Sequence, residues 1–345
     1  MALPPDSRGE GTPAPPGRGF RARSTKRRKP SSGPSRSISE ATAEPPLVLA
    51  VNKPKACTSH DVVARVRRVL SGAKVGHAGT LDPDATGVLV VCVGKATKIS
   101  SFLMEGAKEY RGTGRLGAAT DTQDATGTVL EEKPVTVTED ELRAACAEFA
   151  GELDQVPPMY SAVKVDGQRL YRLARKGVEV ERASRRVTVH ELRVLDVALP
   201  DFTFHLSCSK GTYVRTIVHD VGQRLGCGAH LAELVRTRQG IFDLDRALPW
   251  EALEGAAGPE AVLRAAVTPQ ESLGFLPAFP MPPTIATRKA GEIVSGTPDA
   301  GTGQLLRLLD ARGAVQGVGR VEERGVRILH VLPPATLFGR GRRGA

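Results

Sequence analysis

The sequence predicts an α+β protein with a mixed, largely antiparallel central sheet flanked by helices and a small all-β module at its C-terminal end. From Leu47 onward, short apolar runs alternate with segments of helical period. Residues 202–208 alternate apolar and polar side chains, as expected for a strand buried on one face in an antiparallel sheet. A proline cluster then separates the last helical pattern from short strand-like runs. These features disfavour a single parallel sheet of the dinucleotide-binding type.

The composition is that of a soluble globular protein with a polyanionic partner. The 345 residues are 40% hydrophobic and 25% charged, and no apolar run approaches the 18 residues of a membrane-spanning helix. We therefore expect no membrane association. Five cysteines, odd in number and widely scattered, indicate reduced thiols in a cytoplasmic protein. The net charge of +10 makes nucleic acid the first candidate partner.

Residues 1–46 are predicted to be a disordered basic tail. They hold nine Lys or Arg against four Asp or Glu and nine of the 25 prolines, with almost no branched aliphatic residues. The segment from Arg21 to Lys29 is the most basic and could contact RNA phosphates without reading sequence. A solvated tail with no specific role is an equally open interpretation.

The first half of the folded region is predicted to contain two buried strands and a helix between them. Residues 47–51 and 88–93 are uninterrupted apolar runs of strand length. Between them, Val62, Val66 and other apolar residues up to Leu70 recur at helical spacing, with arginines on the opposite side. Ser59 or Asp61 would cap this helix.

Further along, a second helix, a strand and a third helix are expected. Thr138 and Glu141 have the spacing of a capping box that opens a helix through about Phe149. After the alternating strand at 202–208, apolar residues from Val214 onward return to helical spacing and end at Gly226.

Prolines between residues 269 and 283 mark a domain boundary, after which three apolar runs separated by turns predict the all-β module. The chain is therefore divided into a tail at 1–46, a mixed α and β domain at 47–275 and a C-terminal module at 276–345.

Several cofactor signatures are absent or out of context. Residues 112–117 match GxGxxG, but the following Thr-, Asp- and Gly-rich residues cannot supply the helix that a dinucleotide site needs. No phosphate loop, zinc motif or EF-hand spacing occurs. Asp121 and Asp124 are interpreted as turn residues or as partners of a nearby base. We expect no cofactor and no metal.

The most informative stretch is residues 76–87, GHAGTLDPDATG. Three glycines and a proline within twelve residues predict a compact irregular loop between the helix and the strand at 88–93. Asp82, held in such a loop beside an apolar strand, would be positioned rather than mobile. Taken alone, Asp82 before Pro83 is also compatible with an ordinary turn.

This loop resembles the signature loop of the TruB-type tRNA pseudouridine-55 synthases, in which the Asp of a GxLDPxATG element is the nucleophile. The resemblance extends in order from about residue 47 to 275. It is carried by Lys53-Pro54 with Thr58-Ser59, Lys108 to Arg111, Leu116-Gly117 with Thr120 to Thr122, Gln155 to Lys164, Lys210 to Thr216 and Leu225 to Thr237. Asn52, Ala56 and Val235 depart from the usual family residues, which are Asp, Gly and Arg. The last departure removes a phosphate contact.

The resemblance implies the pseudouridine synthase fold, a C-terminal PUA-like RNA-binding module and a set of site residues. Asp82 would attack, Arg215 would pair with it and keep it ionised, and Tyr110 would stack on the base and act as a base itself. The remaining substrate residues would be His77, which wedges into the RNA, Tyr213 and Leu234, with phosphate contacts assigned to Arg65, Arg67, Arg68, Arg236 and Arg238. Core packing for Tyr160 and Tyr171, and a backbone hydrogen bond for His77, remain alternatives. Tyr213 and Arg215 share a face only if residues 212–215 are extended, so a helix start near Thr216 is predicted.

The implied activity is conversion of uridine to pseudouridine at position 55 in the T-arm of tRNA, with the target base flipped out of the RNA. Breaking C1′–N1 and forming C1′–C5 needs no redox step, so no small-molecule cofactor is expected. The partner is the tRNA T-stem-loop, and the protein is expected to act as a monomer. Aspartate-dependent base exchange on RNA and a non-catalytic RNA-binding or folding module remain alternatives, whereas no cysteine lies in a setting that suits a uridine methyltransferase.

Overall fold

The computed structural model describes residues 46–281, 288–296 and 298–332. All of them belong to one compact unit of the chain, residues 43–345. The predicted tail lies outside the described residues except for Pro46, and so do Pro282 and Pro283 of the proline cluster. Within the described ranges, no helix is both long enough and apolar enough to cross a membrane.

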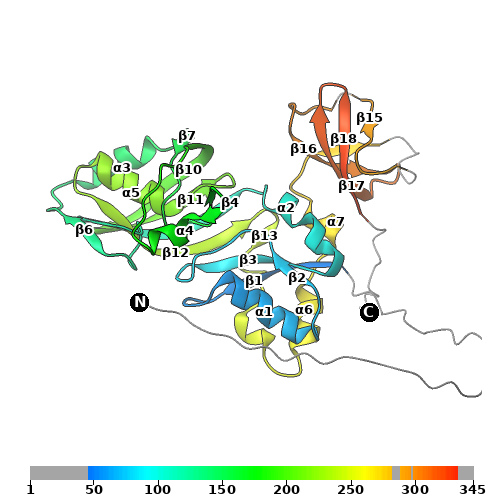
Figure 1. Ribbon diagram of the computed structural model, residues 1–345, viewed down its shortest axis with the longest axis horizontal. Coiled ribbons are helices and arrows are strands. Elements are labelled where there is room, and N and C mark those ends of the chain that lie inside the picture. Colours follow the sequence, from blue (N-terminus) through cyan, green and yellow to red (C-terminus); the bar gives the residue numbers. More distant parts are fainter. Residues whose placement is uncertain (1–45, 282–287, 297, 333–345) are drawn as a thin grey trace, which may run out of the picture. The chain divides into compact units, whose positions relative to one another are not determined.

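The centre of the fold is a nine-stranded mixed sheet (Figure 1). Its main path runs β1-β3-β12-β4-β11-β10-β7, with β2 added beside β3 and β13 beside β12. The strands are β1 (Leu47–Lys53), β2 (Val75–His77), β3 (Thr86–Val93), β4 (Lys108–Leu116), β7 (Gly151–Gln155), β10 (Arg185–Ala198), β11 (Asp201–Cys208), β12 (Ala229–Gln239) and β13 (Phe242–Asp243).

One parallel contact joins the two halves of this sheet. Strands β3 and β12 run parallel, with Thr86 opposite Val235 and Gly87 opposite Arg236, whereas every other pair in the sheet is antiparallel. The predicted mixed, largely antiparallel sheet is therefore confirmed. This contact brings the loop that precedes β3 against the centre of β12.

The helices and short hairpins lie between and beside these strands. Two small ribbons pair β5 with β6 and β8 with β9. The elements are α1 (Ser59–Val69), α2 (Ser100–Leu103), α3 (Glu139–Ala147), α4 (Leu170–Ala174), α5 (Val214–Arg224), α6 (Gly258–Ala265), α7 (Pro269–Ser272), the 3₁₀ helices η1 (Gly94–Ile99) and η2 (Trp250–Leu253), β5 (Ala118–Thr120), β6 (Val129–Glu132), β8 (Lys164–Val165) and β9 (Gln168–Arg169).

Two helix starts differ from the sequence prediction. The N-cap of α1 is Thr58, whose side chain accepts from the Asp61 N–H while the Asp61 carboxylate accepts from the Thr58 N–H. Asp61 is thus the fourth residue of a capping box rather than the cap. Helix α5 begins at Val214, two residues earlier than predicted, so Arg215 is helical and only Tyr213 is extended. The capping box of Thr138 and Glu141 at α3 is confirmed.

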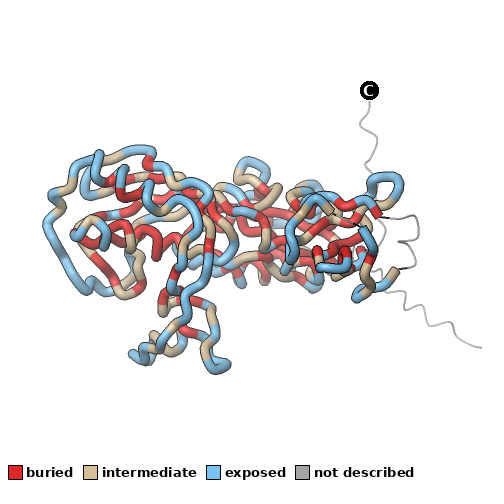
Figure 2. The backbone as a smooth tube through the Cα atoms, turned by 90° about the horizontal axis from the view of Figure 1, so that it is seen from above, coloured by how far each residue is buried: buried red, intermediate tan, exposed pale blue. Residues whose placement is uncertain are grey.

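Strands β1 and β3 are buried on both faces. Alternate residues of each strand belong to two different apolar cores: Leu49 and Leu89 to one, Val48 and Val88 to the other. Helices α1, α3, α5 and α6 contribute to the first core. Figure 2 shows the buried stretches of the chain in red and the exposed ones in pale blue. Burial on both faces explains why these strands have uninterrupted apolar sequences.

The GxGxxG match lies inside β4, as the rejection of a dinucleotide site required. A Cβ atom at Gly112 would lie 2.4 Å from the Phe204 ring, and one at Gly114 would lie 2.4 Å from the Phe202 ring. The two glycines therefore make room for aromatic rings of the neighbouring strand β11. They contact no phosphate-binding helix.

The last described part of the chain is a five-stranded sheet in the order β14-β16-β17-β18-β15. Its core is a separate apolar cluster that includes Phe279, Leu308 and Ile328. This confirms the predicted all-β C-terminal module. Its strands are β14 (Ala278–Pro280), β15 (Ile293–Val294), β16 (Leu305–Leu309), β17 (Val315–Glu322) and β18 (Gly325–Val331).

Candidate active site

A cleft of about 520 Å³ opens where the loop before β3 meets β4, β12 and the start of α5. Its lining includes six of the predicted site residues, namely Asp82, Tyr110, Tyr213, Arg215, Leu234 and Arg236. A volume of this size suits one nucleoside.

Asp82 lies in a turn within the loop of residues 78–85, which follows β2. The Ala85 N–H donates to the Asp82 carbonyl at 3.2 Å, which closes the turn. The Asp82 side chain remains 49% exposed, so its carboxylate is accessible from the cleft. The loop is shorter than predicted, because Gly76 and His77 form part of β2.

Buried polar groups fix this loop from below. The Lys53 side chain is fully buried at the end of β1, and its ammonium group donates to the carbonyls of Pro54, Cys57 and Pro83. Burial lowers the Lys53 pKa below its usual value. On the same side, the Ser59 hydroxyl donates to the Leu81 carbonyl at 3.0 Å and accepts from the Leu81 N–H at 2.9 Å.

Arg215 is the group that faces Asp82. Its Nε lies 3.0 Å from Asp82 Oδ2, and its side chain is only 6% exposed. The other guanidinium nitrogens donate to the carbonyls of Thr122, at 2.8 Å, and Tyr160, at 2.9 Å. Nη1 also lies 3.5 Å from Asp124 Oδ2. The guanidinium is therefore fixed at several points around the contact to Asp82.

Asp124 fulfils both roles suggested for it. It pairs with Arg215, and its Oδ1 accepts from the Thr122 hydroxyl at 2.7 Å and from the Thr126 N–H at 3.0 Å. It is therefore a turn residue that also holds Arg215, the arginine that faces Asp82. Asp121 accepts from the Thr128 N–H at 2.8 Å and takes part in the same turn.

Tyr110 lies on β4 and is 6% exposed. Burial raises its pKa above the usual value, and the charge of the Arg236 guanidinium opposes this rise. The phenol is therefore protonated at neutral pH. This state suits stacking on a base better than proton abstraction.

Tyr213 and Leu234 complete the apolar walls of the cleft. The buried Gln155 side chain binds both main-chain groups of Tyr213: its Oε1 accepts from the Tyr213 N–H at 2.7 Å, and its Nε2 donates to the Tyr213 carbonyl at 3.1 Å. This pairing fixes the residue immediately before α5. Tyr213 and Arg215 therefore both line the cleft, although the predicted extended segment through Arg215 is absent and α5 begins at Val214.

His77, Arg65 and Arg68 lie away from the cleft lining, whereas Arg236 lines the cleft but is buried. His77 is on β2, opposite Val91 of β3, and burial lowers its pKa. Arg65 on α1 pairs with Glu254 at 2.6 Å and lies over the Trp250 ring, while Arg68 is exposed on the same helix. Arg236 is 1% exposed. A side chain so buried does not fit the phosphate contact expected of it.

Sequence reasoning missed several residues that line the cleft. Lys108 precedes Tyr110 by two positions and points to the same face of β4; it is 7% exposed, and its ammonium group donates to the carbonyls of Met104 and Gly106 at 2.8 Å. Burial and the charge of Arg236 lower its pKa to about 8. The two-residue spacing in a strand was the available signal. Arg185, Arg186 and Lys210 also line the cleft.

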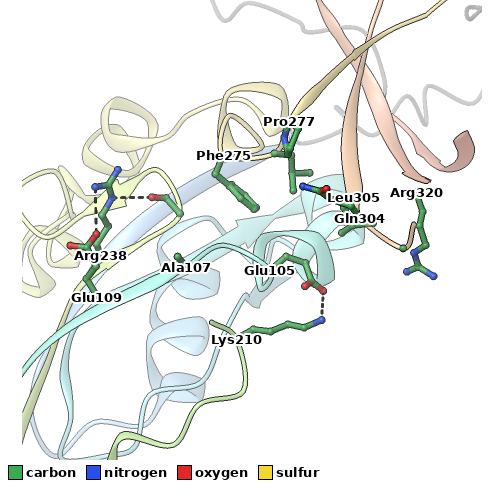
Figure 3. A pocket seen from close by; sticks show the side chains of 13 residues that line it. Glu105, Ala107, Glu109, Lys210, Arg238, Phe275, Pro277, Gln304, Leu305 and Arg320 are labelled. Carbon is green, nitrogen blue, oxygen red and sulfur yellow. Dashed lines mark hydrogen bonds and ion pairs between the residues drawn. The ribbon is translucent and has the colours of Figure 1, made fainter. Parts of the chain in front are cut away.

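A second hollow of about 680 Å³ adjoins the cleft through Lys210, which lines both. Figure 3 shows four of its charged side chains in two pairs: Lys210 with Glu105 at 2.6 Å and Arg238 with Glu109 at 3.6 Å. Arg238, predicted to contact phosphate, lines this hollow and not the cleft. Asp82, Tyr110 and Arg215 all line the cleft and none of them lines this hollow, so the chemistry is assigned to the Asp82 cleft.

Similarity to known proteins agrees with this geometry. Residues 67–214 match the family model described as TruB family pseudouridylate synthase, N terminal domain, and residues 215–273 match the tRNA pseudouridylate synthase B C-terminal domain. A tRNA pseudouridine synthase B from Opitutus terrae is 58% identical over 214 residues, which cover 62% of this chain and 89% of the relative. One from Burkholderia mallei is 45% identical over 283 residues, covering 80% and 93%.

Solved structures with the same fold include a Cbf5-Nop10-Gar1 complex, with a TM-score of 0.64 and 26% identity over 83% of this chain and 84% of that one. An archaeal box H/ACA sRNP Nop10-Cbf5 complex matches with a TM-score of 0.60 and 25% identity, covering 83% and 85%. Together with the family models and the close relatives, these matches show that the chain belongs to the TruB family and is a pseudouridine synthase.

Proposed function

We propose that this protein converts uridine to pseudouridine at position 55 in the T-arm of tRNA, with Asp82 as the nucleophile. The tRNA substrate is supported by the relatives, which are named tRNA pseudouridine synthase B. The observation that carries the proposal is the Asp82 carboxylate, accessible in a nucleoside-sized cleft and 3.0 Å from the buried Arg215 guanidinium.

The reaction needs a nucleophile but no external reactant. The C1′–N1 bond breaks, the detached uracil turns within the cleft and a C1′–C5 bond forms. The proton at C5 leaves to solvent, and N1 takes up a proton from solvent. Asp82 attacks the sugar or the base as an anion, as the nucleophilic carboxylate does in retaining glycosidases. Arg215 orients this anion. The atoms balance without an oxidant or reductant, so the reaction requires no redox cofactor.

The cleft walls bind the everted base. Tyr110 stacks on the uracil as a neutral phenol, and Tyr213 and Leu234 close the apolar sides. Flipping the uridine out of the RNA costs a few kcal/mol of stacking, which these contacts recover. His77 lies on β2 outside the cleft lining, where a wedge into the RNA loop would act on neighbouring nucleotides.

Residues 47–275 form the catalytic domain in this proposal, and residues 276–345 form a PUA-like module that binds RNA. Exposed Arg68 and the less exposed Arg65 contact phosphates, as do the basic residues at the cleft edge. The protein acts as a monomer in this proposal. A tRNA substrate supports a cytoplasmic location.

The test uses tRNA transcripts labelled with tritium at uridine C5. Wild-type protein should release the label from position 55, since C5 exchanges its hydrogen for the glycosidic bond. Asp82→Asn should abolish release while RNA binding is largely preserved. Asp84→Asn is the matched control, because Asp84 is an exposed carboxylate in the same loop, and this variant should keep both properties.

Each other outcome contradicts the proposal. Label that leaves the RNA as intact labelled uracil, and not as tritiated water, would indicate a base-exchanging transglycosylase. Full tritium release by Asp82→Asn would exclude Asp82 as the nucleophile. RNA binding without any release by the wild-type protein would indicate a non-catalytic RNA-binding module.

A further inference from the structure

Arg236 is a buried cation without a carboxylate partner. It lies in the middle of β12 and is 1% exposed, the largest fully buried side chain of the described residues. No Asp or Glu in the described part of the chain lies within ion-pair distance of it. An unpaired charge taken out of water is costly unless its hydrogen bonds are all made, so its contacts need a functional explanation.

The guanidinium donates to main-chain carbonyls on both sides of Asp82. Nε donates to Val88 at 2.6 Å, Nη2 to Gly79 at 3.0 Å and Nη1, more weakly, to Thr80 at 3.5 Å. Gly79 and Thr80 precede Asp82 in the loop, and Val88 follows it at the start of β3. One side chain therefore fixes the distance between the two ends of the segment that carries the nucleophile.

The main chain of Arg236 holds the same segment. Gly87 is its parallel partner, and a Cβ atom at Gly87 would lie 2.2 Å from the Arg236 carbonyl oxygen, a position that also has a φ of +99°. Glycine is thus required for this close approach. Three residues further along β12, the buried Gln239 amide donates to the Ala78 carbonyl, which adds a contact before the loop.

Arg236 also contacts the opposite wall of the cleft. On its other side, β12 pairs with β4, where Tyr110 is the register partner of Arg236. The charge of the guanidinium lowers the pKa of the Tyr110 phenol against the effect of burial. Arg236 thus binds the loop of the proposed nucleophile and pairs, through its strand, with the residue whose aromatic ring is proposed to stack on the base.

We propose that Arg236 is a positioning residue that clamps the Asp82 loop at both ends and sets it at a fixed distance from Tyr110. The proposal rests on the proposed function of Asp82. The planar guanidinium is suited to this task because its N–H groups diverge in fixed directions toward separate carbonyls. A lysine ammonium is a point charge that cannot match the same three carbonyls.

The experiment compares Arg236→Gln and Arg236→Lys with Arg115→Gln. Arg115 lies on β4 of the same sheet, is exposed and pairs with Asp201 at 2.7 Å. Each full-length variant is tested for thermal unfolding, kcat and KM with labelled tRNA, and the salt dependence of tRNA binding. Folded protein is quantified, so kcat is expressed per folded molecule.

Arg236→Gln should lower kcat by about 100-fold, the usual effect of displacing a reacting group by about 1 Å, with KM within about threefold of wild type. Arg236→Lys should recover part of this loss. The slope of log affinity against log salt should not change, because the side chain touches no phosphate. Arg115→Gln should match wild type in every measurement.

Three outcomes would overturn the proposal. A slope reduced by about one with unchanged kcat would make Arg236 a phosphate contact. Lower stability with an unchanged kcat per folded molecule would make it a purely structural residue. If Arg236→Gln does not fold, a wild-type kcat in Arg236→Lys would likewise show that Arg236 is a purely structural residue. In each case Asp82→Asn separates the two proposals: if it is inactive, only the role of Arg236 fails, and if it is active, the nucleophile assignment fails first.

Discussion

The floor and the rim of the cleft are both basic but hold their cations in different ways. The floor contains Lys53, Lys108, Arg215 and Arg236, whose exposed fractions are 0, 7, 5 and 1%. They are the only buried lysines and arginines within residues 46–281, 288–296 and 298–332, and all four border the Asp82 loop or the cleft. The rim contains Arg185, Arg186 and Lys210, which are exposed.

The floor cations and the rim cations also differ in the groups that they contact. Lys53, Lys108 and Arg236 donate to main-chain carbonyls, and of the floor cations only Arg215 meets carboxylates. On the rim, Arg186 lies 3.2 Å from Glu152 and Lys210 lies 2.6 Å from Glu105. Surface pairs of this kind are worth less than about 1 kcal/mol, so a phosphate can replace the carboxylate at little cost.

This difference separates two tasks within one electrostatic field. Fixed carbonyl dipoles meet the desolvation cost of the floor cations and leave their charge directed at the cleft, where it acts on the reacting groups. The rim cations are exposed to water, and we expect them to attract the RNA backbone at long range. Changes in the floor should therefore alter kcat, and changes on the rim should alter affinity and its salt dependence.

The largest effect is expected for Arg215→Gln. The change removes the contact to Asp82 and leaves Asp124, 21% exposed, without its cation. We expect kcat to fall by about 10³-fold, or about 4 kcal/mol, with a much smaller change in KM, because the side chain acts on the reacting carboxylate. Steady-state kinetics of tritium release measures both quantities.

Arg224→Gln on the same helix is the control, since Arg224 is exposed and pairs with Glu148 at 2.8 Å. It should retain wild-type kcat. If Arg215→Gln raised KM and left kcat unchanged, the floor would contribute binding rather than rate, and the contrast with the rim would disappear.

The sequence was sufficient for the parts of the fold that local burial determines. Strands β1 and β3 were recognisable because both of their faces are buried, which demands an uninterrupted apolar run. The Asp82 loop was recognisable because its turns need glycine and proline. Arg215 and Tyr110 were placed through the family resemblance and not through any local pattern.

Long-range contacts determine what the sequence did not reveal. The local sequence gives no sign that Arg236 is buried. The carbonyls that accept its hydrogen bonds come from a loop about 150 residues earlier in the chain. The start of α5 was misplaced because Gln155, 58 residues away, fixes the main chain of Tyr213. The cap of α1 was misassigned because Thr58, Ser59 and Asp61 are all capping residues within four positions.

A smaller effect, on stability, is expected at Lys108. Its pKa is about 8 in the folded state and near 10.5 when unfolded. Between these values the unfolded chain binds more protons, so this residue's contribution to the free energy of unfolding rises with pH. Relative to Lys108→Met, wild type should gain about 2 kcal/mol between pH 7.5 and 9.5. Urea unfolding of both proteins at the two pH values measures this difference.

Comparing the two proteins cancels the other titrating groups, so the relative gain belongs to position 108. An equal response of wild type and Lys108→Met to pH would mean that Lys108 is solvated in the folded protein. Its charge would then be hydrated like that of a rim cation, although the side chain lies in the floor.

The smallest effect is expected for the double change Arg185→Gln with Arg186→Gln on the rim. The two arginines are exposed at the start of β10, and only weak surface pairs hold Arg186. If each contacts one phosphate, the slope of log affinity against log salt should fall by about two, and affinity at moderate salt several-fold. At saturating tRNA, kcat should stay at the wild-type value, because neither side chain reaches Asp82 or Arg215.

Arg193→Gln, an exposed change on the same strand outside the cleft, provides the baseline. A fall in kcat without a change in slope would place these arginines with the floor and would reverse the division of tasks between the two regions.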